Sequence, residues 1–221
     1  QRARRLYSNV IDPLVQNPRD SLKQNSINIL NATSFNEKQA DIGLSYYLET
    51  AFNDRKNAAL GEKDVVFEDP LFFVIEEAHT FIKKDAETET KFIASRIAKE
   101  ARKFGLGLCV VSQRPSKVDE DVLSQMGSFA VLKMIQKRDQ DSIFNTSEEI
   151  TEKMASHLSS LNVGEALLTG RFVKIPTLVK IDEESESKGF GSDISATDAW
   201  EKSTKMNKKI SSQGLIDTED L

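Results

Sequence analysis

Apolar residues along this 221-residue chain occur in two different spacings, which predict strands and helices in turn. Residues 26–31 alternate between polar and apolar, the pattern of a short strand. Residues 70–75 and 108–111 are continuous apolar runs, which are typical of strands buried on both faces, as in a parallel sheet. A further strand is expected over residues 129–134. Residues 164–170 and 177–181 predict a terminal β-hairpin.

Helical spacing separates these strands. Ser34 and Glu37 have the S-x-x-E spacing of a capping box and predict a helix start there. The apolar positions that follow at helical intervals are Ala40, Leu44, Tyr47, Leu48 and Ala51. Residues 53–69 are polar and predict a loop or a frayed helix end. A second helix is expected over residues 86–104 and is ended by Gly105. Its apolar stripe comprises Ile93, Ile97, Ala101 and Phe104.

Two short helices are expected near residues 138–146 and 148–160. Strands that alternate with helices predict an α/β fold with a mostly parallel sheet flanked by helices.

The two ends of the chain differ from its body. Residues 1–25 begin with three arginines and predict a basic helical lead-in, with a helix over residues 2–12. Residues 182–221 contain ten acidic residues and five lysines, so the net charge of −5 falls on this segment. We expect this acidic tail to be flexible and residues 26–181 to form the folded domain. The chain begins with Gln1 without a signal peptide, which indicates a piece of a longer polypeptide.

Composition excludes several classes of protein. No apolar run approaches the ~18 residues of a membrane span. Cys109 is the single cysteine, so a disulfide framework and a cysteine zinc site are excluded, and a cytoplasmic, reducing compartment is expected. The balanced charge of the body means that any nucleic-acid contact requires a local basic surface.

Two polar clusters follow the continuous apolar strands. Glu76-Glu77 follows residues 70–75, and Ser112-Gln113-Arg114 follows residues 108–111. Parallel sheets bind ligands at the carboxyl ends of their strands, so we expect the two clusters to lie side by side. Adjacent carboxylates suit phosphoryl transfer, in which one acid holds Mg²⁺ and the other orients or deprotonates water. The alternative is that the acid pair simply begins a solvated loop.

Four other side chains have open interpretations. Gln113 could sense a γ-phosphate through its amide, or could be a turn residue before Pro115. Arg102 lies opposite the apolar stripe of its helix, so it is either a solvated arginine or one that reaches the nucleotide of a neighbouring subunit. Lys84 has the same two interpretations. His79 could couple parts of the site or be a polar group that faces a helix.

Three motifs in this order resemble the HerA/FtsK group of hexameric P-loop DNA translocases. They are Phe-Phe-Val-Ile-Glu-Glu-Ala-His at 72–79, Ala-Lys-Glu-Ala-Arg-Lys-Phe-Gly at 98–105 and Val-Val-Ser-Gln-Arg-Pro at 110–115. Within that group, residues 26–181 most resemble the carboxyl-terminal part of the ATPase domain of archaeal HerA.

The resemblance implies a RecA-like P-loop ATPase core that forms a hexameric ring around double-stranded DNA. It implies ATP and Mg²⁺ as cofactors, a NurA-type nuclease as partner, and a role in DNA end resection and recombinational repair. By motif, Glu76 is the Walker B acid of the magnesium site, Glu77 the catalytic carboxylate and Gln113 the γ-phosphate sensor. Arg102 resembles an arginine finger that acts across the subunit boundary, and Lys84 a second basic residue acting in trans.

The sequence departs from this family in two places. Glu76 stands where most P-loop ATPases have Asp, although a longer carboxylate can still reach the metal or its water. No G-x-x-x-x-G-K-[ST] motif occurs in the 221 residues. Without that loop nothing cradles the phosphates. We therefore expect the chain alone to hydrolyse no ATP, and the phosphate loop to lie in an amino-terminal part of the parent protein.

Two alternatives stay open. Glu76-Glu77-Ala78-His79 also resembles the acid box of superfamily-2 helicases, but those enzymes have a Ser/Thr-Ala-Thr motif where this chain has Ser112-Gln113-Arg114-Pro115. A degenerate ATPase module that serves ring assembly or partner docking is the non-enzymatic alternative, because the phosphate loop is absent.

Overall fold

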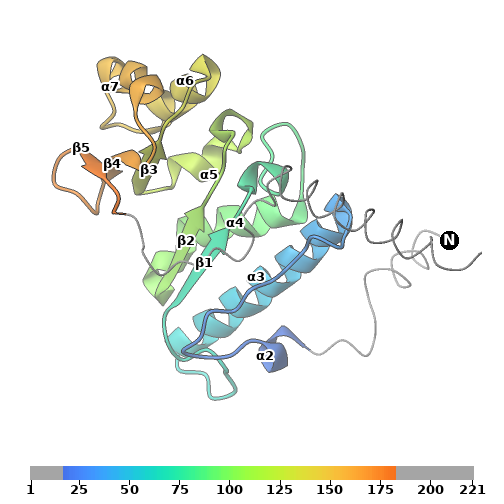
Figure 1. Ribbon diagram of the computed structural model, residues 1–221. Helices are drawn as coiled ribbons and strands as arrows, with labels where there is room; N and C mark the ends of the chain where they lie inside the picture. Colours follow the sequence, from blue (N-terminus) through green and yellow to red (C-terminus); the bar gives the residue numbers. More distant parts are fainter. Residues whose placement is uncertain (1–16, 183–221) are drawn as a thin grey trace, which may run out of the picture. The chain divides into compact units, whose positions relative to one another are not determined.

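The computed structural model describes residues 17–182 (Figure 1). The helix expected over residues 2–12 and almost all of the acidic tail lie outside the described residues. Residues up to Ile181 belong to one compact unit, and only that unit is considered below. The domain boundaries stay predictions.

The parallel sheet consists of two strands, β1 (Leu71–Ile75) and β2 (Leu106–Val110). Leu71 pairs with Leu106 and Ile75 with Val110, so both carboxyl ends lie at the same edge. The helix α4 (Glu89–Glu100) and the 3₁₀ turn η2 (Ala101–Phe104) connect the two strands. This confirms the predicted β-α-β arrangement with a parallel sheet and helices.

One face of this sheet packs on α3 (Glu37–Ala59) and α4 (Figure 1). Leu71, Phe73 and Ile75 of β1 face this core. Apolar residues of both helices pack against them, which confirms the predicted apolar faces of the helices. The buried residues contributed by the helices are Leu48, Phe52, Ile93, Ala94, Ile97 and Ala101. The two helices therefore cover one face of the sheet, and Glu76 and Glu77 at the carboxyl end of β1 stay exposed.

The opposite face of the sheet is open within the described part of the chain, which corrects the prediction of strands buried on both faces. Phe72 and Val74 are 69% and 54% exposed. The Phe72 ring lies over Gly107, where a side-chain Cβ would come within 2.4 Å of the ring. Glycine at position 107 therefore leaves room for the Phe72 ring on the paired strands.

The strand predicted over residues 129–134 does not extend the parallel sheet. β3 (Ser128–Leu132) pairs antiparallel with β4 (Glu165–Gly170), which pairs antiparallel with β5 (Thr177–Lys180). The β4–β5 hairpin is confirmed, but the prediction that β3 continues a mostly parallel sheet is wrong for these residues. Hydrophobic pattern alone cannot specify a strand's partner, and here the hairpin provides the edge that β3 uses.

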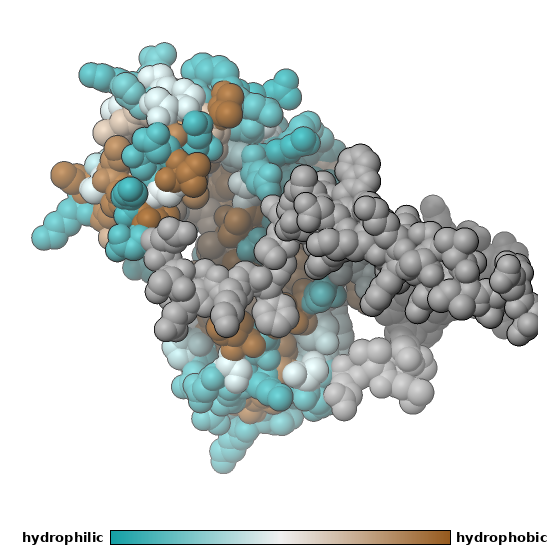
Figure 2. Space-filling model, in the orientation of Figure 1, coloured by the Kyte–Doolittle hydropathy of each residue, from teal (hydrophilic) through white to brown (hydrophobic). Residues whose placement is uncertain are grey.

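Short helices lie between β2 and β4 in the sequence. They are α5 (Glu120–Ser124), α6 (Lys137–Thr146) and α7 (Glu152–His157), with 3₁₀ turns η3 (Pro115–Lys117) and η4 (Leu158–Ser160). Both predicted short helices are thereby confirmed. Val131, Ile143, Leu158 and Leu167 share a separate core. Figure 2 shows apolar side chains at the surface over the β4–β5 hairpin, where Phe172, Ile175 and Leu178 are exposed.

The strand expected over residues 26–31 is absent. These residues follow the short helix α2 (Pro18–Ser21) without pairing to any strand in the described part of the chain. Ile27 and Ile29 are 92% and 84% exposed. An alternating pattern becomes a strand only when a sheet edge receives its backbone groups, and none of the described strands does.

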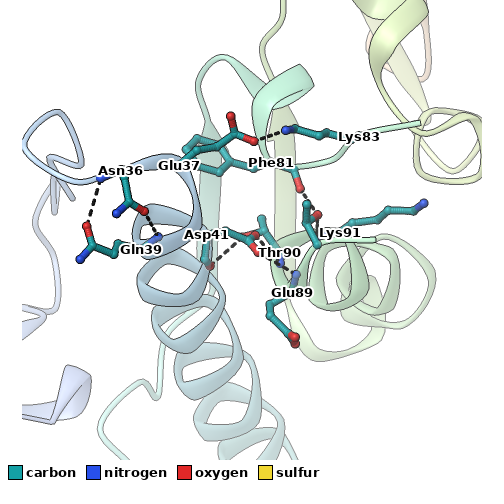
Figure 3. Close-up of polar contacts among 10 residues, drawn as sticks. Asn36, Glu37, Gln39, Asp41, Phe81, Lys83, Glu89, Thr90 and Lys91 are labelled. Atoms are coloured by element: carbon teal, nitrogen blue, oxygen red, sulfur yellow. Dashed lines mark hydrogen bonds and ion pairs between the residues drawn. The ribbon is translucent and has the colours of Figure 1, made fainter. Parts of the chain in front are cut away.

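The start of α3 lies two residues later than predicted (Figure 3). Asn36, not Ser34, is the N-cap, and its Oδ1 accepts from the Gln39 backbone N–H at 3.0 Å. The Gln39 side chain accepts in return from the Asn36 N–H at 3.1 Å. Asn36 and Gln39 have the same capping-box spacing as Ser34 and Glu37. The local sequence therefore permits either Ser34 or Asn36 as the N-cap of this helix. The helix then continues to Ala59, further than the polar composition of residues 53–69 predicts.

A buried carboxylate joins α3 to the beginning of α4 (Figure 3). Asp41 accepts from the backbone N–H groups of Glu89 and Thr90, both at 2.9 Å. The Thr88 hydroxyl accepts from the Lys91 N–H at 3.2 Å. These three contacts satisfy the free N–H groups of the first turn of α4. They fix the helix that carries the chain from β1 to β2.

Candidate active site

The backbone beyond β1 and β2 is held together by two hydrogen bonds. The Val111 N–H donates to the Ile75 carbonyl, and the Ala78 N–H donates to the Val111 carbonyl, both at 2.9 Å. Residues 76 and 77 therefore form a tight turn against the end of β2, before the 3₁₀ turn η1 (Ala78–Thr80). The two polar clusters lie side by side, as predicted.

Glu77 occupies a strained position in this turn. Its φ is +47° and its ψ is +42°, the left-handed region that non-glycine residues avoid at a cost of about 1 kcal/mol. Asn25 is the other non-glycine residue with positive φ in the described part of the chain. Strain of this kind persists where surrounding contacts fix the backbone, and it is found at functional sites.

The Glu77 carboxylate has a side-chain nitrogen near each oxygen. Gln113 Nε2 donates to Glu77 Oε1 at 3.0 Å, and His79 Nδ1 lies 3.2 Å from Glu77 Oε2. His79 Nδ1 also lies 3.2 Å from the Ser112 hydroxyl. The structure thus joins the predicted residues Glu77 and Gln113 directly. It also includes Ser112 of the second polar cluster and His79, for which the sequence left open a coupling role or that of a polar group facing a helix.

Glu76 lies in a different environment. It is exposed, and its carboxylate makes no hydrogen bond or ion pair with the described residues. Burial, and then the negative charge of Glu76, raise the pKa of the Cys109 thiol on the open face of the sheet. Glu76 therefore lies on the Cys109 side of the sheet, while Glu77 turns toward Gln113 and His79.

Arg102 is at the opposite edge of the sheet from these carboxylates. It lies in η2, directly before β2, and is exposed without a partner among the described residues. The five residues of β2 span roughly 16 Å. Because an arginine side chain is shorter than this strand, the structure does not bring Arg102 to the Glu77 cluster of the same chain.

Lys84 has a partner in the same chain. Its Nζ lies 2.6 Å from Glu120 Oε1, and the backbone of Lys84 donates to the Lys117 carbonyl at 2.9 Å. The hydrogen bond and charge of Glu120 raise the pKa of Lys84 above its usual value, so the side chain is a cation at neutral pH. Both groups are well exposed, so the pair can exchange for other partners.

No group of three or more His, Cys, Asp or Glu side chains within residues 17–182 is arranged to enclose a metal ion. Magnesium does not need such a cage, because it keeps several waters and binds one or two carboxylates together with substrate phosphates. The unpaired carboxylate of Glu76 fits this kind of site.

Comparison with known proteins first defines the class of fold. The genome packaging NTPase B204 of Sulfolobus turreted icosahedral virus 2, in complex with sulfate, superimposes with a TM-score of 0.51. The similarity covers 65% of this chain and 63% of that protein, at 15% sequence identity, so it concerns the fold alone. The α/β fold of this chain therefore resembles the fold of that protein.

Sequence relatives then identify the family. The chain is 42% identical over 202 residues to the DNA double-strand break repair helicase HerA of Saccharolobus solfataricus, and 40% identical over 196 residues to that of Sulfolobus acidocaldarius. The matches cover 91% and 89% of this chain. The HerA helicase of Pyrococcus furiosus is 31% identical over 229 residues. The chain is homologous to a segment of the HerA helicases, and it spans about 40% of the length of these relatives.

No model of a protein family matches the sequence. Among the helices of residues 17–182, none has the length and apolar character required to cross a membrane.

Proposed function

We propose that this chain is part of an ATP-driven translocase or helicase of double-stranded DNA, which acts in DNA end resection and recombinational repair. The observation that supports it most is the contact between Glu77 and Gln113 at the carboxyl edge of β1 and β2. Homology to HerA helicases and the NTPase fold agree with it. A hexameric ring and a NurA-type nuclease partner belong to the same proposal.

Each residue of the site has a role in this proposal. Glu77 accepts a proton from, or orients, the water that attacks the γ-phosphate. Gln113 detects, through its side-chain amide, whether a γ-phosphate is present, and its hydrogen bond to Glu77 supports this role. Glu76 would hold Mg²⁺, which when bound neutralises charge on the phosphates. Its open position on the Cys109 side leaves its oxygens free for this purpose.

Arg102 is proposed to act on the nucleotide of a neighbouring subunit. Its position before the amino end of β2 supports this, because Glu77 lies at the opposite edge of the sheet. Lys84 would act in trans only after its ion pair with Glu120 opens. The pair is exposed and therefore weak, so such an exchange is energetically accessible.

Hydrolysis requires a phosphate loop in addition to these residues. We propose that the parent protein supplies it and that the 221-residue chain alone is inactive. Steady ATP turnover by this chain, abolished by Glu77→Gln, would overturn that part of the proposal.

The first test is DNA-stimulated ATP hydrolysis by the full-length parent protein, compared with its Glu77→Gln variant. We expect double-stranded DNA to stimulate the wild type and the substitution to abolish turnover, because an amide cannot take up the proton. Glu62→Gln, an exposed glutamate in the loop before β1, is the matched control and should leave the rate unchanged.

Binding of DNA without hydrolysis by the wild type would contradict the proposal and favour a degenerate module for ring assembly or docking. DNA binding itself should weaken steeply with salt and tolerate any sequence, since a translocase contacts mainly phosphates.

A further inference from the structure

His79 is the described residue that touches both the carboxylate of Glu77 and the end of the neighbouring strand. Its Nδ1 lies 3.2 Å from Glu77 Oε2 and 3.2 Å from Ser112 Oγ. The contact with Glu77 is an ion pair when the imidazole is protonated, and the hydrogen bond of Nδ1 is with the Ser112 hydroxyl. The Ser112 oxygen also accepts from the Arg114 backbone N–H at 3.0 Å, which fixes the hydroxyl beside the imidazole.

Glu77 needs such support because little else holds its side chain. The side chain is 49% exposed, and its backbone has the left-handed conformation. A half-exposed glutamate without donors would occupy several rotamers, which would separate its oxygens from any fixed water position. Gln113, after β2, donates to Oε1, and His79, in η1, places its Nδ1 beside Oε2. Together they restrict both oxygens.

We infer that His79 is a positioning residue for Glu77: its Nδ1, held beside Ser112, orients the carboxylate for the attacking water. His79 does not itself touch the reacting atoms in this arrangement. The inference rests on the proposed function, because it assigns His79 to the hydrolytic step of that site. It predicts that loss of the imidazole lowers the rate of the chemical step without weakening nucleotide binding.

The test uses the full-length parent protein with DNA and measures kcat and KM for ATP. His79→Ala should lower kcat roughly tenfold and leave KM unchanged. His79→Asn should restore most of the rate, because an asparagine amide can place an N–H near the position of Nδ1. His157→Ala, a change of the exposed histidine at the end of α7, is the control and should have no effect.

The comparison of the Ala and Asn variants separates positioning from a general structural role, because only the Asn side chain can place an N–H near the position of Nδ1. An unchanged kcat in His79→Ala, or equal losses in the Ala and Asn variants, overturns the inference while leaving the ATPase proposal intact.

A measurement of the contact between His79 and Glu77 distinguishes failure of the inference from failure of the proposed function. Nitrogen NMR of the histidine rings should contain a signal that His79→Asn removes, and Glu77→Ala should shift that signal. If the wild type hydrolyses nothing, the proposed function fails and the inference falls with it. If hydrolysis is normal and the signal does not respond to Glu77→Ala, only the positioning role of His79 is overturned.

Discussion

Gln113 Nε2 donates a hydrogen bond to Glu77 Oε1 at 3.0 Å, although the two residues are separated by a whole helix in the sequence. The bond joins the ends of two parallel strands, where β1 supplies the carboxylate and β2 supplies the amide. A change at the end of one strand can therefore alter the catalytic group on the other.

Removal of this amide should impair hydrolysis. In the full-length parent, Gln113→Ala should lower the steady-state rate of ATP hydrolysis at least roughly tenfold, because Glu77 Oε1 loses its hydrogen bond. Gln125→Ala, a change of an exposed glutamine at the end of α5, is the matched control. A normal rate in Gln113→Ala would mean that the bond in the structure has no role in turnover.

Arg102 can be tested by mixing inactive subunits. Arg102→Ala and Glu77→Gln proteins should each be inactive alone. When they are mixed in equal amounts, about a quarter of the subunit interfaces would combine an intact Glu77 with an intact Arg102 from its neighbour, so activity should partly return. If Arg102 acted within its own chain, no subunit would have both residues and the mixture would stay inactive.

Asp41 should be important for stability and not for chemistry. Asp41→Ala leaves the N–H groups of Glu89 and Thr90 without acceptors in a buried position, which should cost about 2 kcal/mol or more of the free energy of unfolding. Urea unfolding of the 221-residue chain measures this change. Asp69→Ala, a change of an exposed aspartate in the loop before β1, should have little effect. Equal stabilities of the two variants would contradict the role of Asp41.

The environment of Cys109 can be followed by pH-dependent alkylation of the 221-residue chain. Burial and the charge of Glu76 raise the pKa of this thiol, so the thiolate, which is the reactive form, appears only at higher pH than for an ordinary cysteine. Glu76→Gln removes the like charge, and the midpoint of the rate against pH should move down. It should remain above that of a free thiol because burial is retained.

Glu77→Gln serves as the control for this measurement, since Glu77 does not contribute to the pKa shift of Cys109. An unchanged midpoint in Glu76→Gln would show that Glu76 does not lie beside the thiol on the open face of the sheet.

The sequence by itself determined the elements that depend on short-range pattern. The apolar runs before Glu76 and Ser112 became the paired strands β1 and β2, and the stripe of Ile93 and Ile97 became the buried face of α4. The sequence also predicted that Glu77 and Gln113 lie close together, because parallel strands that are joined by one helix place their carboxyl ends at one edge of the sheet.

Other features were decided only by tertiary structure, because they depend on partners distant in the sequence. The alternating residues 26–31 had no strand edge to join, and β3 found its edge in the β4–β5 hairpin instead of in the parallel pair. The choice between Ser34 and Asn36 as the helix cap was likewise not fixed by the local pattern. The contacts of His79 with Glu77 Oε2 and of Thr90 with Asp41 form only in the folded chain. Residue spacing in the sequence does not predict them, because a polar contact requires the two groups to come within reach in space.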